Sequence, residues 1–224
     1  MMKEQDFQDK LNKLSDLKPS DSTVDTSKKT FPDWNRIYSE MKVEEMPWYL
    51  PELDPDLKET LHDLNIVSGN FLDLGTGPGT QAIELSEMGF DVTGIDISFD
   101  AIKNAKKTNN RVKFIQDDIL NSHINQQFDF IFDRGCFHII DEDKRTSYIS
   151  QIAKILNKEG LFFLKCFSDK NTVTGFGPYH ISRTLIKELF GKQFNILQIK
   201  DSVYQSTSSQ QNKTLFVVMK KKVE

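Results

Sequence analysis

Between residues 71 and 219, short apolar segments alternate with segments whose apolar residues recur at helical spacing. This alternation predicts parallel strands joined by right-handed helical crossovers, and therefore an α/β fold with a doubly wound, mostly parallel sheet. The last two apolar segments have no helical segment between them, so we expect them to pair antiparallel at one edge. The expected strands are 71–74, 91–95, 112–115, 128–132, 161–167, 194–199 and 215–219, and the expected intervening helices are 80–88, 99–109, 143–156 and 182–190.

Residues 1–30 are predicted to be a flexible, polar N-terminal segment. Val24 is the only apolar residue between residues 20 and 30, a composition typical of a linker. Apolar residues at helical spacing precede it, at Phe7, Leu11, Leu14 and Leu17. They fit either a frayed terminal helix or a lid that docks over a ligand. We assign residues 31–224 to one compact domain.

Composition narrows the class of protein. The hydrophobic fraction is 38%, and no stretch approaches the roughly 18 apolar residues of a membrane span. The net charge of −4 argues against a protein that holds nucleic acid through its phosphates. Two cysteines are too few for a disulfide framework or a cysteine-rich metal site. We expect a cytoplasmic enzyme, monomeric or dimeric, with no metal, no membrane partner and no nucleic-acid partner.

The segment FLDLGTGPG, residues 71–79, places three glycines between a predicted strand and a predicted helix. This is the context of a nucleotide-binding turn, because glycine allows positive φ and a close approach of the backbone to a ligand. The spacing is G-x-G-x-G at Gly75, Gly77 and Gly79, whereas dinucleotide-binding folds use G-x-G-x-x-G. We therefore predict a nucleotide-like ligand at this turn that is not a dinucleotide.

Acidic residues surround the turn. Asp73 precedes it, at a position from which a carboxylate can hold an ammonium group of the ligand. Asp96 ends the next strand about 20 residues beyond, where an acid grips a ribose diol, and we place Ile97 in the same site. Asp118 follows the third strand and is expected to accept from the exocyclic amine of adenine, with Ile119 against the ring. The alternative is that these acids are surface acids or cap the loops that follow them.

Taken together, the segments FLDLGTGPG, VTGID, QDDIL, FDFIFDRG and KEGLFFLKCFS resemble the class I S-adenosylmethionine-dependent methyltransferases. The resemblance covers the chain from about Trp34 to its end. It implies a Rossmann-like, three-layer αβα fold with a seven-stranded sheet in the order 3-2-1-4-5-7-6, with the seventh strand antiparallel. It also implies S-adenosylmethionine as the cofactor and S-adenosylhomocysteine as the product.

A narrower resemblance links WNRIYSE, MPW, DRGCFH and GPY to the branch that holds the thiopurine, thiol, halide and tellurite methyltransferases. In that branch N-terminal tryptophans help cover the cofactor, which points to Trp34 and Trp48; both also fit plain core aromatics. The DRG element begins at Asp133, which we place among the cofactor-binding residues, beside the site of methyl transfer.

The acceptor is expected outside the carboxyl ends of the strands, where we place Arg134, His138 and Tyr179. Each has an alternative role. Arg134 either contacts a polar acceptor or pairs with a carboxylate and braces its loop. His138 fits a base or a hydrogen-bonded structural residue, and Tyr179 either lines the acceptor pocket or braces the loop. The cysteines fit small buried side chains better than nucleophiles.

These features predict in-line methyl transfer to a small-molecule acceptor, with a soft nucleophile such as a thiol that needs no strong general base. One alternative is a protein or RNA methyltransferase, although the segment DRGC differs from an NPPY-type signature. The other is a cofactor-binding Rossmann protein without catalysis, or one that depends on nicotinamide.

Overall fold

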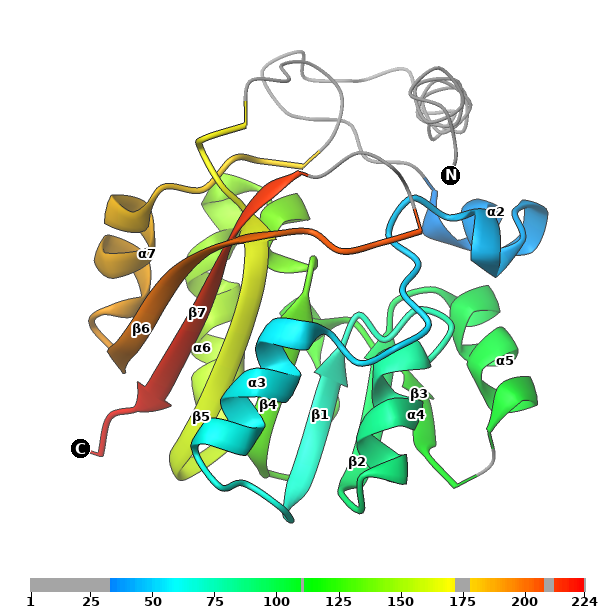
Figure 1. The fold of residues 1–224 in the computed structure, drawn as a ribbon, viewed down its shortest axis with the longest axis horizontal. Helices are drawn as coiled ribbons and strands as arrows, with labels where there is room; N and C mark the ends of the chain where they lie inside the picture. Colours follow the sequence, from blue (N-terminus) through cyan, green and yellow to red (C-terminus); the bar gives the residue numbers. More distant parts are fainter. Residues whose placement is uncertain (1–32, 110, 172–177, 208–211, 224) are drawn as a thin grey trace.

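The computed structural model describes residues 33–223 apart from residues 110, 172–177 and 208–211. Its centre is a seven-stranded sheet (Figure 1). The strands are β1 (Asn70–Leu74), β2 (Asp91–Asp96), β3 (Lys113–Gln116), β4 (Phe128–Arg134), β5 (Leu156–Phe167), β6 (Phe194–Val203) and β7 (Lys213–Lys221). The predicted N-terminal segment 1–30 lies outside the described residues.

The strand order is β3-β2-β1-β4-β5-β7-β6, which confirms the predicted topology. β1 pairs in parallel with both β2 and β4, and β4 pairs in parallel with β5. β7 runs antiparallel to β5 and β6, so the last two strands form the expected antiparallel pair, and the reversed strand lies one position in from the edge. The chain switches direction across the sheet between β1 and β4, where open α/β sheets bind their ligands.

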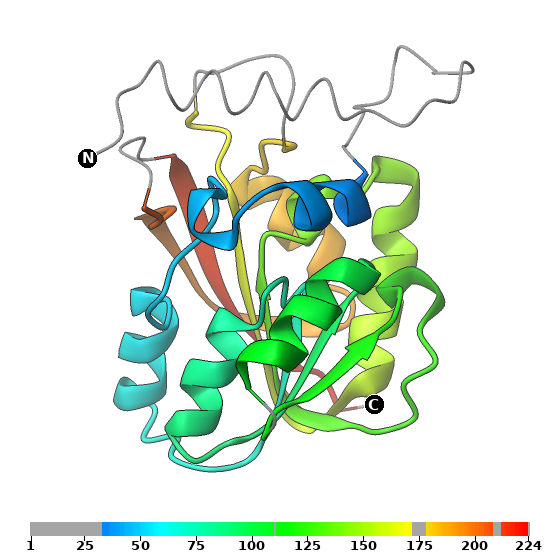
Figure 2. The same ribbon diagram turned by 90° about the vertical axis from the view of Figure 1, so that its right-hand side faces the viewer.

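Helices cover both faces of the sheet and give the three predicted layers (Figures 1 and 2). α3, α4 and α5 pack on one face and α6 and α7 on the other. The helices are α2 (Trp34–Glu40), α3 (Pro55–Asp63), α4 (Thr80–Glu87), α5 (Phe99–Thr108), α6 (Arg145–Ile155) and α7 (Arg183–Phe190), with short 3-10 turns at Val43–Glu45, Ile119–Asn121, Phe137–Ile139 and Glu142–Lys144.

Side chains of successive residues in the central strands pack into the cores on opposite faces of the sheet, because side chains alternate along a strand. In β5, Phe162 and Leu164 join the core under α6 and α7, whereas Leu161 and Phe163 pack against the core under α3, α4 and α5. The next residue on that second face is Lys165, which is fully buried. A lysine in a row of core residues requires buried partners.

β5 starts earlier than predicted. It begins at Leu156, directly after α6, and its register with β4 shifts between Phe128 and Phe130. Glu159 adopts a φ of 63° within this irregular stretch. The sequence NKEG at residues 157–160 looks like a loop, and the bulge allows it to remain attached to the strand.

Candidate functional site

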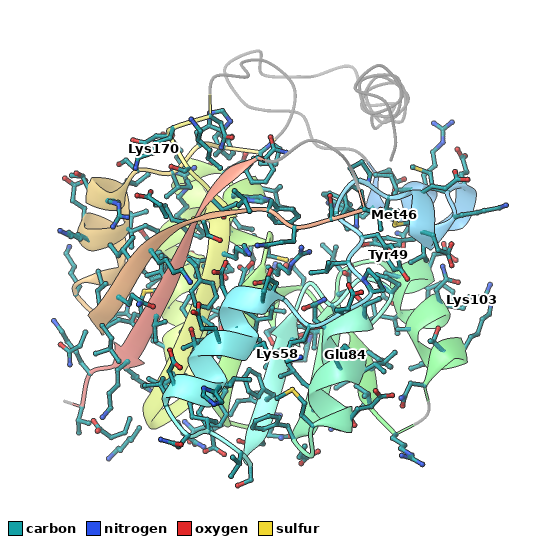
Figure 3. The ribbon with its side chains drawn as sticks, in the orientation of Figure 1. Met46, Tyr49, Lys58, Glu84, Lys103 and Lys170 are labelled. Atoms are coloured by element: carbon teal, nitrogen blue, oxygen red, sulfur yellow. The ribbon has the colours of Figure 1, made fainter. Side chains whose placement is uncertain are left out.

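The N-terminal part of the domain lies across the carboxyl ends of the strands. α2 packs above α5 (Figure 2), and Asn35 Oδ1 accepts hydrogen bonds from Ser98 Oγ at 3.0 Å and Phe99 N at 2.8 Å. Met46 and Tyr49 lie between α2 and α4 in Figure 3. We call residues 34–54 the cover.

A hollow opens between the cover, the glycine turn and the end of β4. We call it the hollow throughout, and its lining residues are Tyr38, Val43, Met46, Trp48, Tyr49, Asp73, Gly75, Thr76, Gly77, Pro78, Thr80, Gln81, Arg134 and Tyr204. It therefore lies at the switch between β1 and β4. It brings together the predicted residues Trp48, Asp73, Gly75, Gly77 and Arg134.

The glycine turn requires glycine. Gly75, Gly77 and Gly79 have φ values of 69°, 52° and 85°, in the left-handed region that L side chains rarely adopt. A Cβ on Gly75 would lie 2.1 Å from Cys136 Sγ, and one on Gly79 would lie 2.6 Å from Phe114 Cζ. A Cβ on Gly77 would lie 2.7 Å from the Tyr38 hydroxyl, so the neighbouring side chains leave room only for glycine at all three positions.

Asp73 lies at the floor of the hollow, with only 2% of its surface exposed. Thr76 Oγ1 donates to its Oδ2 at 2.6 Å. Burial raises the pKa of Asp73 to about 7, against hydrogen bonds from Thr76 and the backbone of Ala82 that lower it. The charge of Arg134 also lowers this pKa, but no described lysine or arginine forms an ion pair with Asp73, so the buried carboxylate is suited to a cationic group of a ligand.

Asp96 organises the turn from the next strand. Its Oδ2 accepts from Gly77 N at 2.9 Å and its Oδ1 accepts from Ser98 N at 2.8 Å. Burial raises the pKa of Asp96 to about 6, although these amides lower it. Each carboxylate oxygen keeps a second acceptor position for a diol. Ile97 beside it is 52% exposed, so its side chain is open to a ligand.

Asp118 and Ile119, the residues predicted to contact adenine, interact with groups of the loop that follows β3 and with the core. Asp118 caps the turn at Ile119–Asn121 by accepting from Leu120 N at 3.0 Å and Asn121 Nδ2 at 3.1 Å. Asp117 accepts from His123 N at 3.2 Å. Both Asp117 and Asp118 therefore cap the loop that follows them, which was the alternative to a contact with adenine. Ile119 is buried in the core beneath α6, so its side chain is packed within the protein.

Asp133 lies at the end of β4, as predicted, and its carboxylate is turned into the protein. Its carboxylate is completely buried and accepts from the backbone N–H groups of Gly135, Cys136 and Phe137 at 2.6–2.9 Å. The Tyr148 hydroxyl also donates to it. Burial raises its pKa to about 6 even so. These four donors occupy its acceptor positions, so Asp133 shapes the turn after β4.

Arg134 takes the bracing role. Its Nε donates to Asp54 Oδ2 at 2.8 Å, and its Nη1 donates to Trp48 O at 3.0 Å and to the Tyr204 hydroxyl at 3.3 Å. Its Nη2 donates to Gln205 O. The guanidinium therefore reaches the wall of the hollow with most of its donors already used.

His138 and Tyr179 also take structural roles. Phe167 N donates to His138 Nδ1 at 3.1 Å, and a backbone N–H only donates, so Nδ1 carries a lone pair and the neutral ring is protonated at Nε2. The Tyr179 hydroxyl donates to Asp141 Oδ1 at 2.9 Å, and its ring lies 4.9 Å from the Arg145 guanidinium. Burial raises the pKa of the Cys136 and Cys166 thiols well above their ordinary value. Thiols that stay protonated are poor nucleophiles, so both cysteines fit the role of small packing side chains.

The two tryptophans form one edge-to-face pair, with ring centroids 5.7 Å apart. Trp48 lines the hollow, and Trp34 is not among its lining residues. Sequence reasoning missed several residues of this region: Tyr38, Tyr49, Asp54, Asp56, Gln81, Lys165, Tyr204 and Gln205. The one available signal was Lys165, a charge inside the apolar run LFFLKCF.

The chain is similar to known proteins in sequence and in fold. The methyltransferase domain family matches residues 71–160. An uncharacterized methyltransferase of Schizosaccharomyces pombe is 37% identical over 109 residues, which are 46% of this chain and 74% of the relative. A structure described as the conversion of a disulfide bond into a thioacetal group during echinomycin biosynthesis superimposes with a TM-score of 0.71 at 20% identity, covering 84% of this chain and 91% of the other.

The Burkholderia thailandensis 1,6-didemethyltoxoflavin-N1-methyltransferase, with 1,6-didemethyltoxoflavin and S-adenosylhomocysteine bound, superimposes with a TM-score of 0.61 at 20% identity. The match covers 75% of this chain and 78% of the other. In the part of the chain that the structure describes, no helix combines the length and apolar character needed to cross a membrane.

Proposed function

This chain belongs to the S-adenosylmethionine-dependent methyltransferases, and we propose that it methylates a small molecule through a soft nucleophile such as a thiol. In this proposal Asp73 holds the ammonium of the cofactor and the glycine turn meets its carboxylate. Asp96 binds the ribose, and Ile97 and Asp118 lie toward the adenine. Trp48 covers the methionine part and Trp34 supports Trp48.

The observation that carries the acceptor proposal is that the described residues lining the hollow include no histidine, no lysine and no carboxylate other than Asp73. Among its described lining residues, the ionisable side chains are Tyr38, Tyr49, Asp73, Arg134 and Tyr204. Burial raises the pKa of Tyr38 and of Tyr204, so both phenols stay protonated at neutral pH. Asp73 is assigned to the cofactor, and Arg134 is paired with Asp54. A thiolate reaches the methyl group already deprotonated, whereas an alcohol or amine needs a group to take its proton.

The walls also suit a small acceptor. Tyr49 and Tyr204 give the hollow aromatic surfaces besides Trp48, which is assigned to the cofactor, and such surfaces bind flat apolar groups. A screen of thiols, halides, tellurite, thiopurines and small phenols, reading release of S-adenosylhomocysteine, tests the proposal. Turnover of phenols alone would contradict it.

Cofactor affinity should depend on pH through Asp73. An ammonium binds the ionised carboxylate, and the pKa of Asp73 is raised to about 7 by burial. The dissociation constant for S-adenosylhomocysteine should therefore rise about tenfold from pH 8 to pH 6, because a proton must leave before binding. Calorimetry at both pH values measures it, and Asp73→Asn should bind weakly with a flat profile. If the dissociation constant of Asp73→Asn still rose steeply between pH 8 and pH 6, the proton that controls binding would belong to another group.

Asp73 should also affect the stability of the ligand-free protein, and this effect weakens as the pH rises, whereas cofactor affinity increases. Without ligand, its pKa in the folded state lies above the unfolded value, so the folded state holds the proton longer. The contribution of Asp73 to the free energy of unfolding is therefore greatest below about pH 4 and is lost as the pH rises toward 7.

Replacing His138 tests whether a base is used. In His138→Asn the side-chain oxygen can accept from Phe167 N as Nδ1 does now. We expect kcat with a thiol acceptor to stay within about threefold of the wild type, because removal of a general base costs 100-fold or more. Initial rates between pH 6 and 9 provide the measurement. A loss of two orders of magnitude, restored at high pH, would make His138 the base.

A further inference from the structure

Lys165 is a buried cation outside the hollow. It lies on the face of β5 that carries the core residues Leu161 and Phe163, and none of its surface is exposed. It is not among the residues that line the hollow. An ammonium at such a depth is tolerated only with excellent hydrogen-bonded partners.

The partners of Lys165 come from two distant parts of the chain. Its Nζ lies 2.9 and 2.8 Å from the two carboxylate oxygens of Asp54 and 2.7 Å from Asp56 Oδ2. The same atom donates to Gln205 Oε1 at 2.5 Å. The two acids end the cover and begin α3, whereas Gln205 belongs to residues 203–207, which we call the β6–β7 segment.

Arg134 makes the same connection one strand away. It is the register partner of Lys165 in the β4–β5 pair, and it contacts Trp48 and Asp54 on one side and Tyr204 and Gln205 on the other. Two neighbouring cations therefore each hold both the cover and the β6–β7 segment. These segments also touch directly, since Thr207 N donates to Tyr49 O at 3.1 Å.

The segments so joined carry two walls of the hollow. Trp48 and Tyr49 line it from the cover, and Tyr204 lines it from the β6–β7 segment. The spacing of these aromatic rings depends on the groups that fix the two segments. Stability alone is a weak reason for such a cluster, because apolar residues of similar volume often replace buried ion pairs without loss.

We infer that Lys165 is a positioning residue, which sets the width of the acceptor side of the hollow by holding Asp54 and Gln205 together. This inference rests on the proposed function for its effect on catalysis. Its structural content, the coupling of the cover to the β6–β7 segment, does not depend on which acceptor is used. Among the described residues, no hydrogen bond or ion pair joins Lys165 to the glycine turn, to Asp73 or to Asp96, so we expect it to act on the acceptor side more than on the cofactor.

Lys165→Met tests the inference, because methionine keeps a similar length and removes the charge. Both acids retain a partner: Asp54 keeps Arg134 at 2.8 Å, and Asp56 keeps Lys200 at 3.2 Å. Lys200→Met is the matched control, since it removes a lysine from Asp56 on the outer side, where the Lys200 side chain is 39% exposed. Gln205→Ala removes the Lys165 contact while leaving every charge in place.

Two readouts are needed. The first is hydrogen–deuterium exchange of peptides covering residues 46–54 and 203–207, which should rise in both segments together in Lys165→Met and in Gln205→Ala. The second is kinetics with thiophenol, for which KM should rise about fivefold, the scale of coupling through a side-chain network. The dissociation constant for S-adenosylhomocysteine should change less than twofold. Lys200→Met should match the wild type in both measurements.

The double variant Lys165→Met/Gln205→Ala should be no worse than the more affected single variant, because both changes break one connection. Exchange and KM in Lys165→Met equal to those in Lys200→Met would overturn the inference. If the wild type does not methylate thiophenol, that result counts against the proposed acceptor, and the exchange experiment still decides the role of Lys165.

Discussion

Gly75→Ala is expected to weaken binding of S-adenosylhomocysteine by about 100-fold, the largest single effect that the structure predicts. The residue has a φ of 69°, and a Cβ there would lie 2.1 Å from Cys136 Sγ. Left-handed backbone costs a non-glycine residue roughly 1–2 kcal/mol, and relief of the overlap adds about as much again. The turn must therefore move, and its backbone would no longer meet the cofactor.

Gly89→Ala is the matched control for this change. Gly89 also has a positive φ, 98°, but a Cβ on it meets nothing within 4 Å, and it lies at the far end of α4. It should lose about 1 kcal/mol of stability and keep full cofactor affinity. Calorimetry on both folded variants separates backbone strain from the site. Equal affinity in the two variants would place the cofactor away from this turn.

Asp96→Ala is expected to weaken cofactor binding by about 1.5–3 kcal/mol, or roughly 10- to 100-fold. The substitution removes the proposed ribose acceptor and also frees Gly77 N and Ser98 N, which the carboxylate now holds. Both losses act in the same direction, because the turn is less ordered before it binds.

Asp91→Ala serves as the control for Asp96→Ala, since Asp91 is an exposed acid at the opposite end of the same strand. Its removal changes the net charge equally and should leave the dissociation constant unchanged. An unaltered dissociation constant in folded Asp96→Ala would remove Asp96 from the cofactor site.

The topology was predictable because its determinants are local. Apolar segments such as 71–74 and 128–132 alternate with amphipathic helices, and the handedness of crossovers leaves few arrangements. The glycine turn was predictable for the same reason, since a strand, three glycines and a helix follow one another directly. The resemblance to known methyltransferases then supplied the strand order, which the structure confirms.

The partners of the charged residues were not predictable, because they are distant in the chain. Lys165 and Asp54 are separated by 111 positions, and Arg134 and Gln205 by 71. From the sequence alone Arg134 fits either acceptor contact or bracing, and only the fold brings Trp48, Asp54 and Tyr204 to its guanidinium. The sequence likewise does not show that Tyr148 and three backbone amides surround the carboxylate of Asp133.

The hollow therefore gains a physical description that the sequence lacked. Its floor carries one buried acid, Asp73, its walls are largely aromatic, and its one cation, Arg134, is neutralised by Asp54 among the residues that the structure describes. This arrangement favours a reaction in which the cofactor supplies the reactive carbon and the protein supplies orientation and exclusion of water.

A competition between thiophenol and phenol tests the central claim most directly, because the two acceptors differ only in the nucleophilic atom. The purified protein is given both at equal concentration with S-adenosylmethionine labelled in its methyl group. We predict label on the sulfur of thiophenol and none on phenol, with a rate that His138→Asn leaves nearly unchanged. Label on phenol in preference to thiophenol would contradict the account. So would a second assay in which added protein or RNA is labelled while neither small acceptor is.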